Sequence, residues 1–168
     1  MQTDFRGLIR ILSQGGVEFI VVGGAAATGH GSTRLTIDLD IVYRRTTENI
    51  AHLVRALAPL EPYLRGAPPG LPFRWTDETI RKGLNFTLIT TLGAIDLLGE
   101  ITGGGAFEDI KPHSLTINLH GTECMCLNIE WLIKVKRAAG RPKDFEAIAE
   151  LEAILEERQK LEAESAGT

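Results

Sequence analysis

The stretch from Val21 to Tyr43, VVGGAAATGHGSTRLTIDLDIVY, constrains the fold more than any other part of the chain. An apolar run ends in a Gly-Gly pair at residues 23–24, and a second apolar run follows that carries two aspartates. We expect a buried strand, a turn at the glycines, a short helix over about residues 25–31, and a second strand over residues 35–43. The two carboxylates in that second strand need an explanation, because burying a charge is costly unless it is paired.

Alternation along the second strand places Asp38 and Asp40 on one face, and Ile37, Leu39 and Ile41 on the other. Two carboxylates this close repel each other strongly unless a cation lies between them. Oxygen ligands without histidine or thiolate favour Mg²⁺ or Mn²⁺ over Zn²⁺. The alternative is an edge strand whose polar face simply meets water.

A third carboxylate, Asp96, occurs within the apolar run TLGAIDLLGEI, which we expect to be a strand. An unpaired carboxylate there would cost several kcal/mol. A metal shared with Asp38 and Asp40 would provide the partner, and Asp96 could then also act as a general base for an attacking hydroxyl. Alternatively, Asp96 caps a turn or pairs with an arginine such as Arg34 or Arg81.

Two other features suit a phosphate chain. Gly23 and Gly24 would leave a bare backbone with free N–H groups at the junction between strand and helix. Arg34 lies four residues before Asp38 and could reach the phosphates from the connecting loop, although a surface ion pair would explain it equally well. The formal net charge of -4 argues against a protein that coats nucleic acid without specificity, but residues 134–143 hold five basic side chains and no acid.

The rest of the chain predicts one domain of mixed helices and strands over residues 1–163, followed by a disordered tail at 164–168. Strands are expected over residues 85–91 and 94–98 as a hairpin, and over 114–129 as a pair that turns at Gly121. The segment ITGGGAFEDI at 101–110 is expected to be a flexible loop. Helices are expected over 5–14, 48–58, 130–140 and from Pro142 onward, with the last one presenting an apolar stripe.

Composition favours a soluble globular protein, with 43% hydrophobic and 24% charged residues. No apolar run is long enough to cross a bilayer, and the first residues do not read as a secretory signal. We therefore expect a cytoplasmic protein with no membrane partner.

Residues 21–43 resemble the signature of the nucleotidyltransferase superfamily of DNA polymerase beta type. That signature consists of a hydrophobic residue, then Gly-Gly or Gly-Ser, then a spacer, and then Asp-hydrophobic-Asp. The stretch LIKVKRAAGRPKDFEAIAEL, residues 132–151, resembles the C-terminal motif of small bacterial members, including the AbiEii-type toxin nucleotidyltransferases. The resemblance implies an α+β fold of the polymerase beta type, with a mixed β-sheet, flanking helices and a C-terminal helical segment.

The resemblance also implies roles for individual residues. Gly23 and Gly24 would bind the nucleoside triphosphate, while Asp38 and Asp40 would ligate two magnesium ions with Asp96 completing the site. The downstream motif matches at Lys136, Arg141 and Asp144, where the two basic groups would meet phosphate and the acid would orient them.

The implied activity is Mg²⁺-dependent (or Mn²⁺-dependent) transfer of a nucleotide from an NTP such as ATP to a hydroxyl of RNA, including tRNA, or of a protein. A role in a toxin–antitoxin system would add a cognate antitoxin or toxin protein as a partner. The alternative is a non-catalytic, antitoxin-like module that binds a nucleotide or a partner on the same fold. Like the compact family members, the chain has no evident substrate-recognition domain, so the resemblance leaves the acceptor undefined.

Overall fold

A mixed seven-stranded sheet forms the centre of the computed structural model, which describes residues 2–167. Its middle strands, β1 (Phe19–Val22) and β2 (Asp38–Tyr43), are antiparallel to each other. Each also has a parallel neighbour, β9 (Thr122–Leu127) beside β1 and β5 (Gly93–Leu98) beside β2. The full order is β3-β4-β5-β2-β1-β9-β8, with β3 (Tyr63–Leu64), β4 (Phe86–Thr90) and β8 (Ser114–Leu119) in the outer positions.

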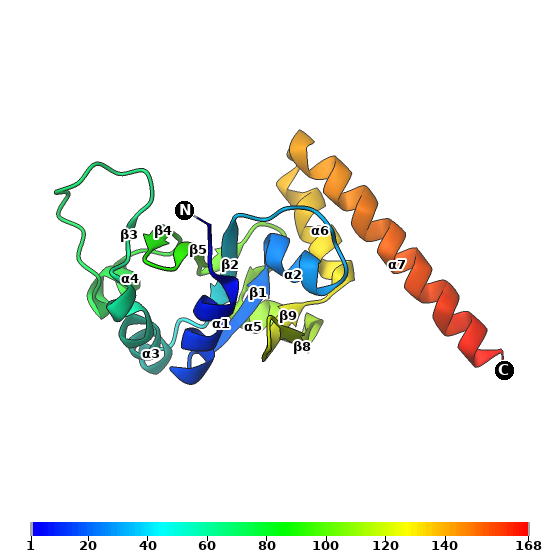
Figure 1. Ribbon diagram of the computed structural model, residues 1–168, viewed down its shortest axis with the longest axis horizontal. Coiled ribbons are helices and arrows are strands. Elements are labelled where there is room, and N and C mark those ends of the chain that lie inside the picture. The colour runs from blue at the N-terminus through cyan, green and yellow to red at the C-terminus, as the bar shows by residue number, and fades with distance from the viewer. Residues whose placement is uncertain (1, 168) are drawn as a thin grey trace.

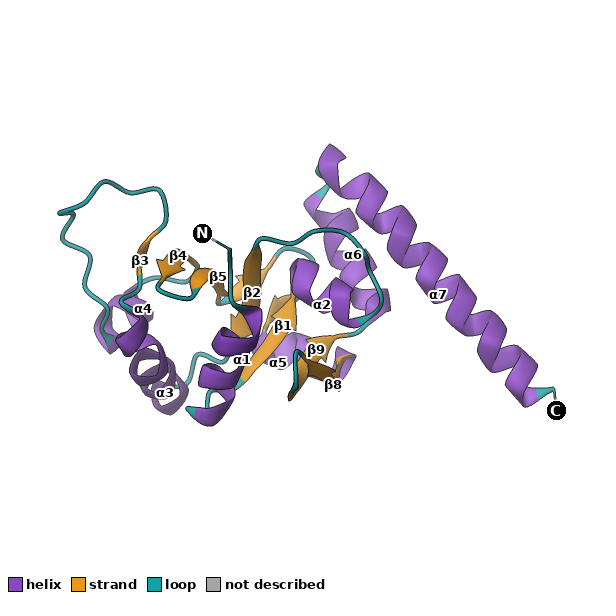
Figure 2. Ribbon diagram, in the orientation of Figure 1, coloured by secondary structure: helices purple, strands orange, loops and turns teal. Residues whose placement is uncertain are grey.

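Helices surround this sheet, and Figure 2 shows α3 and α4 toward one end of the molecule and α6 and α7 toward the other. The α-helices are α1 (Phe5–Gln14), α2 (Gly23–Gly29), α3 (Thr47–Leu57), α4 (Asp77–Lys82), α5 (Phe107–Ile110), α6 (Ile129–Ala139) and α7 (Phe145–Ala166). Short 3₁₀ turns are η1 (Ala58–Leu60), η2 (Lys111–His113) and η3 (Pro142–Asp144). The predicted mixed α+β architecture is confirmed.

Side-chain caps explain where several helices begin. Asp4 accepts a hydrogen bond from the Gly7 amide at the start of α1, and Thr46 accepts one from the Asn49 amide at the start of α3. Each cap satisfies an amide that would otherwise lack a partner. At the other end of α6, Gly140 takes the left-handed conformation with a φ of 63° and terminates the helix.

The apolar core lies on the strands and the helix faces that cover them. Ile20, Val21, Leu39 and Ile41 are fully buried at the centre of the sheet. Because β1 is buried along its whole length, it reads as a continuous apolar run rather than an alternating one. This buried pair of strands gives the adjacent aspartates a rigid support.

The prediction for the start of β2 was wrong by three residues. Leu35 and Ile37 were expected in the strand, but they precede it with 92% and 72% of their surface exposed. The register explains the difference, because Asp38 pairs with Ala94 and β5 begins only one residue earlier, at Gly93. Residues before Asp38 therefore have almost no neighbouring strand to pair with.

The segment 101–110 was predicted to be a flexible loop, and this was also wrong. Two short strands, β6 (Glu100–Ile101) and β7 (Gly105–Ala106), form a hairpin that leads directly into α5. Gly103 and Gly105 have φ angles of 79° and 88°, which suits glycine at a tight turn. Burial of Phe107 and Ile110 then anchors the segment to the core.

The C-terminal helix α7 packs against α6, and Arg158 still donates to the backbone carbonyl of His30. The end of α7 lies at one extreme of the molecule (Figure 1). Of its predicted apolar stripe, Ile148 and Leu151 are buried, whereas Phe145 is 63% exposed. The helix continues to Ala166 and so includes residues 164–166, which we expected in a disordered tail. Within residues 2–167, no helix combines the length and the apolar character needed to cross a membrane.

Candidate active site

The register of the sheet brings three carboxylates together. Asp40 and Asp96 are direct partners across the parallel pair β2–β5, and Asp38 lies two residues earlier on the same face of β2. One oxygen from each of the three side chains lies within 4.8 Å of the others. The convergence expected from the sequence is therefore present, at a partly exposed position where a solute can reach it.

Arg65 provides the counter-charge of this cluster. It lies directly after β3, and its Nη2 donates to Asp96 Oδ1 at 2.7 Å while Nη1 lies 3.6 Å from Asp38 Oδ2. Its Nε and Nη2 also donate to the carbonyl oxygen of Leu88 on β4, at 3.2 and 2.8 Å. Asp96 thus pairs with an arginine, as one of the alternatives held, but the arginine is neither Arg34 nor Arg81.

Crowding of the carboxylates changes their protonation. Burial raises the pKa of Asp40 to about 8, with further contributions from Asp38 and Asp96 and an opposing one from Lys136. Burial also raises the pKa of Asp38, again assisted by Asp96, while Arg65 acts in the opposite direction. Without a metal, burial and the neighbouring carboxylates therefore favour the protonated form of Asp40 at neutral pH.

The two glycines lie against the cluster and its flanking loop. Gly23 has a φ of 64°, and a β-carbon there would collide with the carboxylate of Asp40. A β-carbon on Gly24 would lie 2.6 Å from Oγ1 of Thr36. The missing side chains therefore let the Asp40 carboxylate and the Thr36 hydroxyl pack directly against the backbone. Gly23 and Gly24 each line a cavity, where their backbone is open to a phosphate chain.

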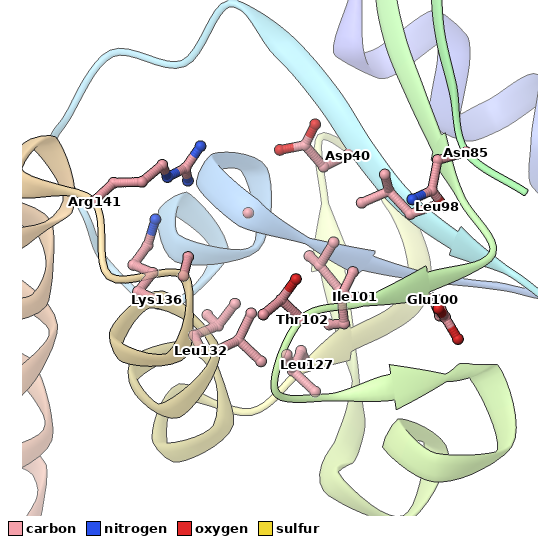
Figure 3. A pocket seen from close by; sticks show the side chains of 14 residues that line it. Asp40, Asn85, Leu98, Glu100, Ile101, Thr102, Leu127, Leu132, Lys136 and Arg141 are labelled. Atoms are coloured by element: carbon pink, nitrogen blue, oxygen red, sulfur yellow. The ribbon is translucent and has the colours of Figure 1, made fainter.

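A cavity of about 280 Å³ opens beside Asp40. Lys136 from α6 and Arg141 from the segment after it extend their charged ends toward the side of the cavity that Asp40 occupies (Figure 3). The remaining lining is largely apolar, with Leu98, Ile101, Leu127, Leu132 and Val135, and includes the polar side chains of Asn85, Glu100 and Thr102. A mixed cavity of this kind suits a ligand with a flat apolar part and an anionic part.

Asp144 holds Arg141 in place. Its carboxylate is 5% exposed and accepts a hydrogen bond from Nε of Arg141 at 2.7 Å. A buried carboxylate needs such a partner, and the pairing restricts the guanidinium to one side of the cavity. The orienting role that the resemblance implies for this acid stays a prediction.

Arg34 lies apart from the three carboxylates. It forms a surface ion pair with Glu146 at 3.3 Å, as the alternative interpretation held. It also lines a second cavity of about 250 Å³ together with Gly24, Lys136 and Lys143. Lys136 therefore borders both the first and the second cavity.

Three residues of the site were not found by sequence reasoning, namely Arg65, Asn85 and Thr102. Arg65 begins a Gly- and Pro-rich loop, and nothing in its neighbours signals that β3 and β4 carry it to Asp96. Asn85 accepts a hydrogen bond from the Gly99 amide at 2.8 Å, so its side chain also fixes the start of the β6–β7 hairpin. Thr102 lies within the segment predicted to be a loop.

The donor set fits a hard divalent cation. Asp38, Asp40 and Asp96 offer only carboxylate oxygens, which is the chemistry that Mg²⁺ and Mn²⁺ prefer. Lys136, Arg141 and the backbone of Gly23 line the same cavity as Asp40, where an anionic ligand would neutralise the two basic side chains. The residues present can therefore hold a metal ion and a phosphate chain side by side.

No protein-family model matches the chain, and no curated protein matches its sequence. Two solved structures are similar to it. A proposed nucleotidyltransferase of Thermotoga maritima has a TM-score of 0.53 and 14% identity, over 89% of this chain and 94% of that chain. The lincosamide antibiotic adenylyltransferase LnuA, solved with lincomycin bound, has a TM-score of 0.59 and 15% identity, over 92% of this chain and 99% of that chain.

The chain has a nucleotidyltransferase fold. Both similar chains are covered almost completely, so the likeness includes the helical segment after the sheet as well as the sheet itself. Within the nucleotidyltransferase fold of this protein, β1, β2 and β5 position the glycines and the three carboxylates, and α6 brings Lys136 to the cavity beside them.

Proposed function

We propose that this protein is a nucleotidyltransferase that uses Mg²⁺, or Mn²⁺, to transfer a nucleotide from an NTP to an acceptor hydroxyl. The observation that carries the proposal is the convergence of Asp38, Asp40 and Asp96 within 4.8 Å, next to a cavity that Gly23 and two basic side chains line. The fold shared with nucleotidyltransferases supports it.

In this proposal the three aspartates hold the metal through their carboxylate oxygens. Bound there, a divalent metal would supply electrostatic stabilisation for the charge that develops on the phosphate oxygens during transfer. The acceptor oxygen forms a bond to the α-phosphorus, and the bond from that phosphorus to the pyrophosphate oxygen breaks. Asp96 accepts the proton of the acceptor hydroxyl, while its Oδ1 stays bonded to Arg65.

The phosphates of the NTP would contact backbone and basic side chains. Gly23 and Gly24 would approach the chain of phosphates, and Lys136 and Arg141 would neutralise it from the opposite side of the cavity. Asp144 would keep Arg141 oriented through their hydrogen bond. Arg34 would bind the far end of the triphosphate in the second cavity, which requires it to leave Glu146.

The acceptor in this proposal is an RNA, such as a tRNA, or a protein. This part rests on the resemblance of residues 132–151 to the motif of AbiEii-type toxin nucleotidyltransferases. A toxin–antitoxin role, a cognate partner protein, ATP as the preferred nucleotide and a cytoplasmic location belong to the same proposal.

A small-molecule acceptor is the second candidate. It is favoured by the similarity to LnuA, whose structure holds lincomycin and which this chain matches over 99% of LnuA's length.

The direct test is transfer of label from each α-labelled NTP, with Mg²⁺, to total tRNA, to protein or to a panel of hydroxylated small molecules. Labelled product should form with the wild type and disappear in Asp38→Ala. Asp77→Asn, which changes an aspartate on α4 outside the cluster, is the matched control and should retain activity. Absence of product with every acceptor, under conditions where the protein is folded, would contradict the proposal.

The rival is a non-catalytic binding module on the same fold. Calorimetry separates the two, because an enzyme of this kind should bind NTP only with Mg²⁺ and lose that binding in Asp40→Asn. Tight nucleotide binding without metal would favour the module.

A further inference from the structure

The position of Arg65 is set by the sheet and not by the carboxylates alone. Its backbone amide donates to the Thr87 carbonyl at 3.0 Å, continuing the pairing of β3 with β4. Its side chain donates twice to the Leu88 carbonyl, and is 29% exposed. With two kinds of backbone anchor, the guanidinium stays beside the cluster whatever the protonation or ligand state of the aspartates.

From that position Arg65 reaches two of the three carboxylates. It bonds to Asp96 Oδ1 at 2.7 Å and lies 3.6 Å from Asp38 Oδ2, which is an ion pair without a short hydrogen bond. Within residues 2–167, the contacts of Arg65 with Asp96 and Asp38 are the ion pairs that involve the three aspartates. A charge-assisted bond to Asp96 is strong, whereas the looser contact with Asp38 can be given up at little cost.

We propose that Arg65 is the internal counter-ion of the three-aspartate site, and that it opposes binding of a bare divalent cation so that the cation enters together with the phosphates of the nucleotide. This inference rests on the proposed function and adds to it a positioning residue and an order of binding.

Simple electrostatics supports this order. A fixed positive charge within a few ångström of the cluster repels an incoming divalent cation and lowers the affinity of the site for it. An NTP that carries the same cation has net negative charge, so Arg65, Lys136 and Arg141 attract the complex instead of repelling it. Binding of the metal alone is thereby disfavoured relative to binding of the metal–nucleotide complex.

The test measures Mn²⁺ binding without nucleotide, by the electron paramagnetic resonance signal of free Mn²⁺ in mildly alkaline buffer. Arg65→Gln should bind Mn²⁺ about ten-fold or more tightly than the wild type, the order that one nearby unit charge exerts on a divalent ion in a water-like dielectric. Arg65→Lys, which keeps the charge, should stay within about two-fold of the wild type. Arg55→Gln removes an exposed arginine of α3 and serves as the control for net charge.

A second readout is the thermal unfolding midpoint with and without Mn²⁺. Without Arg65 the carboxylates repel one another unopposed, so added Mn²⁺ should raise the thermal unfolding midpoint of Arg65→Gln more than that of the wild type. If Arg65→Gln does not fold, Arg65→Lys still decides the matter, because a ten-fold tightening in that charged variant would overturn the counter-ion role.

The outcomes separate the inference from the proposed function. Unchanged or weaker Mn²⁺ binding in Arg65→Gln, in a protein whose wild type binds Mn²⁺ and whose Asp40→Asn variant does not, would refute only the role of Arg65. If the wild type binds no Mn²⁺ either with or without NTP, the proposed function fails, and the inference fails with it.

Discussion

Replacing Asp40 with asparagine should stabilise the metal-free protein in alkaline solution, although the aspartate belongs to the proposed metal site. The pKa of Asp40 is raised from 3.8 to about 8 by burial and by Asp38 and Asp96. Between these two pH values the folded state binds more protons at this group than the unfolded state does, so its contribution to stability falls as the pH rises. Asparagine keeps the shape of the side chain and removes the charge.

The size of the effect follows from the same linkage. About 1.4 kcal/mol for each pH unit between 3.8 and about 8 gives an upper limit of about 6 kcal/mol above pH 8. Water and Lys136 compensate part of the charge in the folded state, and we expect Asp40→Asn to be more stable than the wild type by about 2 kcal/mol or more. At about pH 4 the difference should vanish, because the carboxyl group is then protonated in the folded protein.

The assay is guanidinium unfolding of both proteins with a chelator present, at about pH 4 and about pH 8.5. The difference in free energy of unfolding should be small in acid and large in alkali, and Asp77→Asn should show no such trend. Added Mg²⁺ should stabilise the wild type and not Asp40→Asn. An Asp40→Asn variant that is less stable than the wild type at the higher pH would refute the reasoning.

Three further substitutions test other parts of the site. Gly23→Ala should lower the free energy of unfolding by about 1 to 2 kcal/mol, because alanine disfavours the left-handed conformation and its β-carbon meets Asp40, and thermal unfolding measures this. Asp144→Asn should raise KM for the NTP about ten-fold with a smaller change in kcat, since Arg141 loses a charge-assisted bond, and an unchanged KM would argue against the orienting role. Arg34→Gln should raise KM for the NTP several-fold, as steady-state kinetics would measure. Its free energy of unfolding should stay within about 1 kcal/mol of the wild type, because the ion pair is exposed. An unchanged KM with a large loss of stability in chemical unfolding would indicate a purely structural role.

Local patterns in the sequence predict the central part of the site well. The strand that ends at the glycines, the Asp-Leu-Asp strand and the strand around Asp96 all form, because apolar runs of this length and composition need burial. That Asp96 reaches the other two aspartates depends on the pairing of β2 with β5. The sequence shows only that each buried carboxylate needs a partner. That the three carboxylates share one partner, a metal ion, is an inference.

Features that depend on distant contacts could not be predicted. Arg65 meets Asp96 through the order β3-β4-β5, which a single sequence does not reveal. The hairpin of β6 and β7 was concealed by its glycines, which mark turns and flexible loops alike. Ile37 was assigned to a strand because its alternation continues that of β2, yet β5, the parallel neighbour, begins only at Gly93 and so leaves Ile37 without a strand partner on that side.

The most direct test of the central claim is titration calorimetry of a non-hydrolysable NTP with and without Mg²⁺. If Asp38, Asp40 and Asp96 jointly hold the metal that binds the triphosphate, the wild type will bind the analogue only when Mg²⁺ is present, and asparagine at any of the three positions will abolish binding. Equal affinity with and without Mg²⁺, or full binding by Asp96→Asn, would contradict the account.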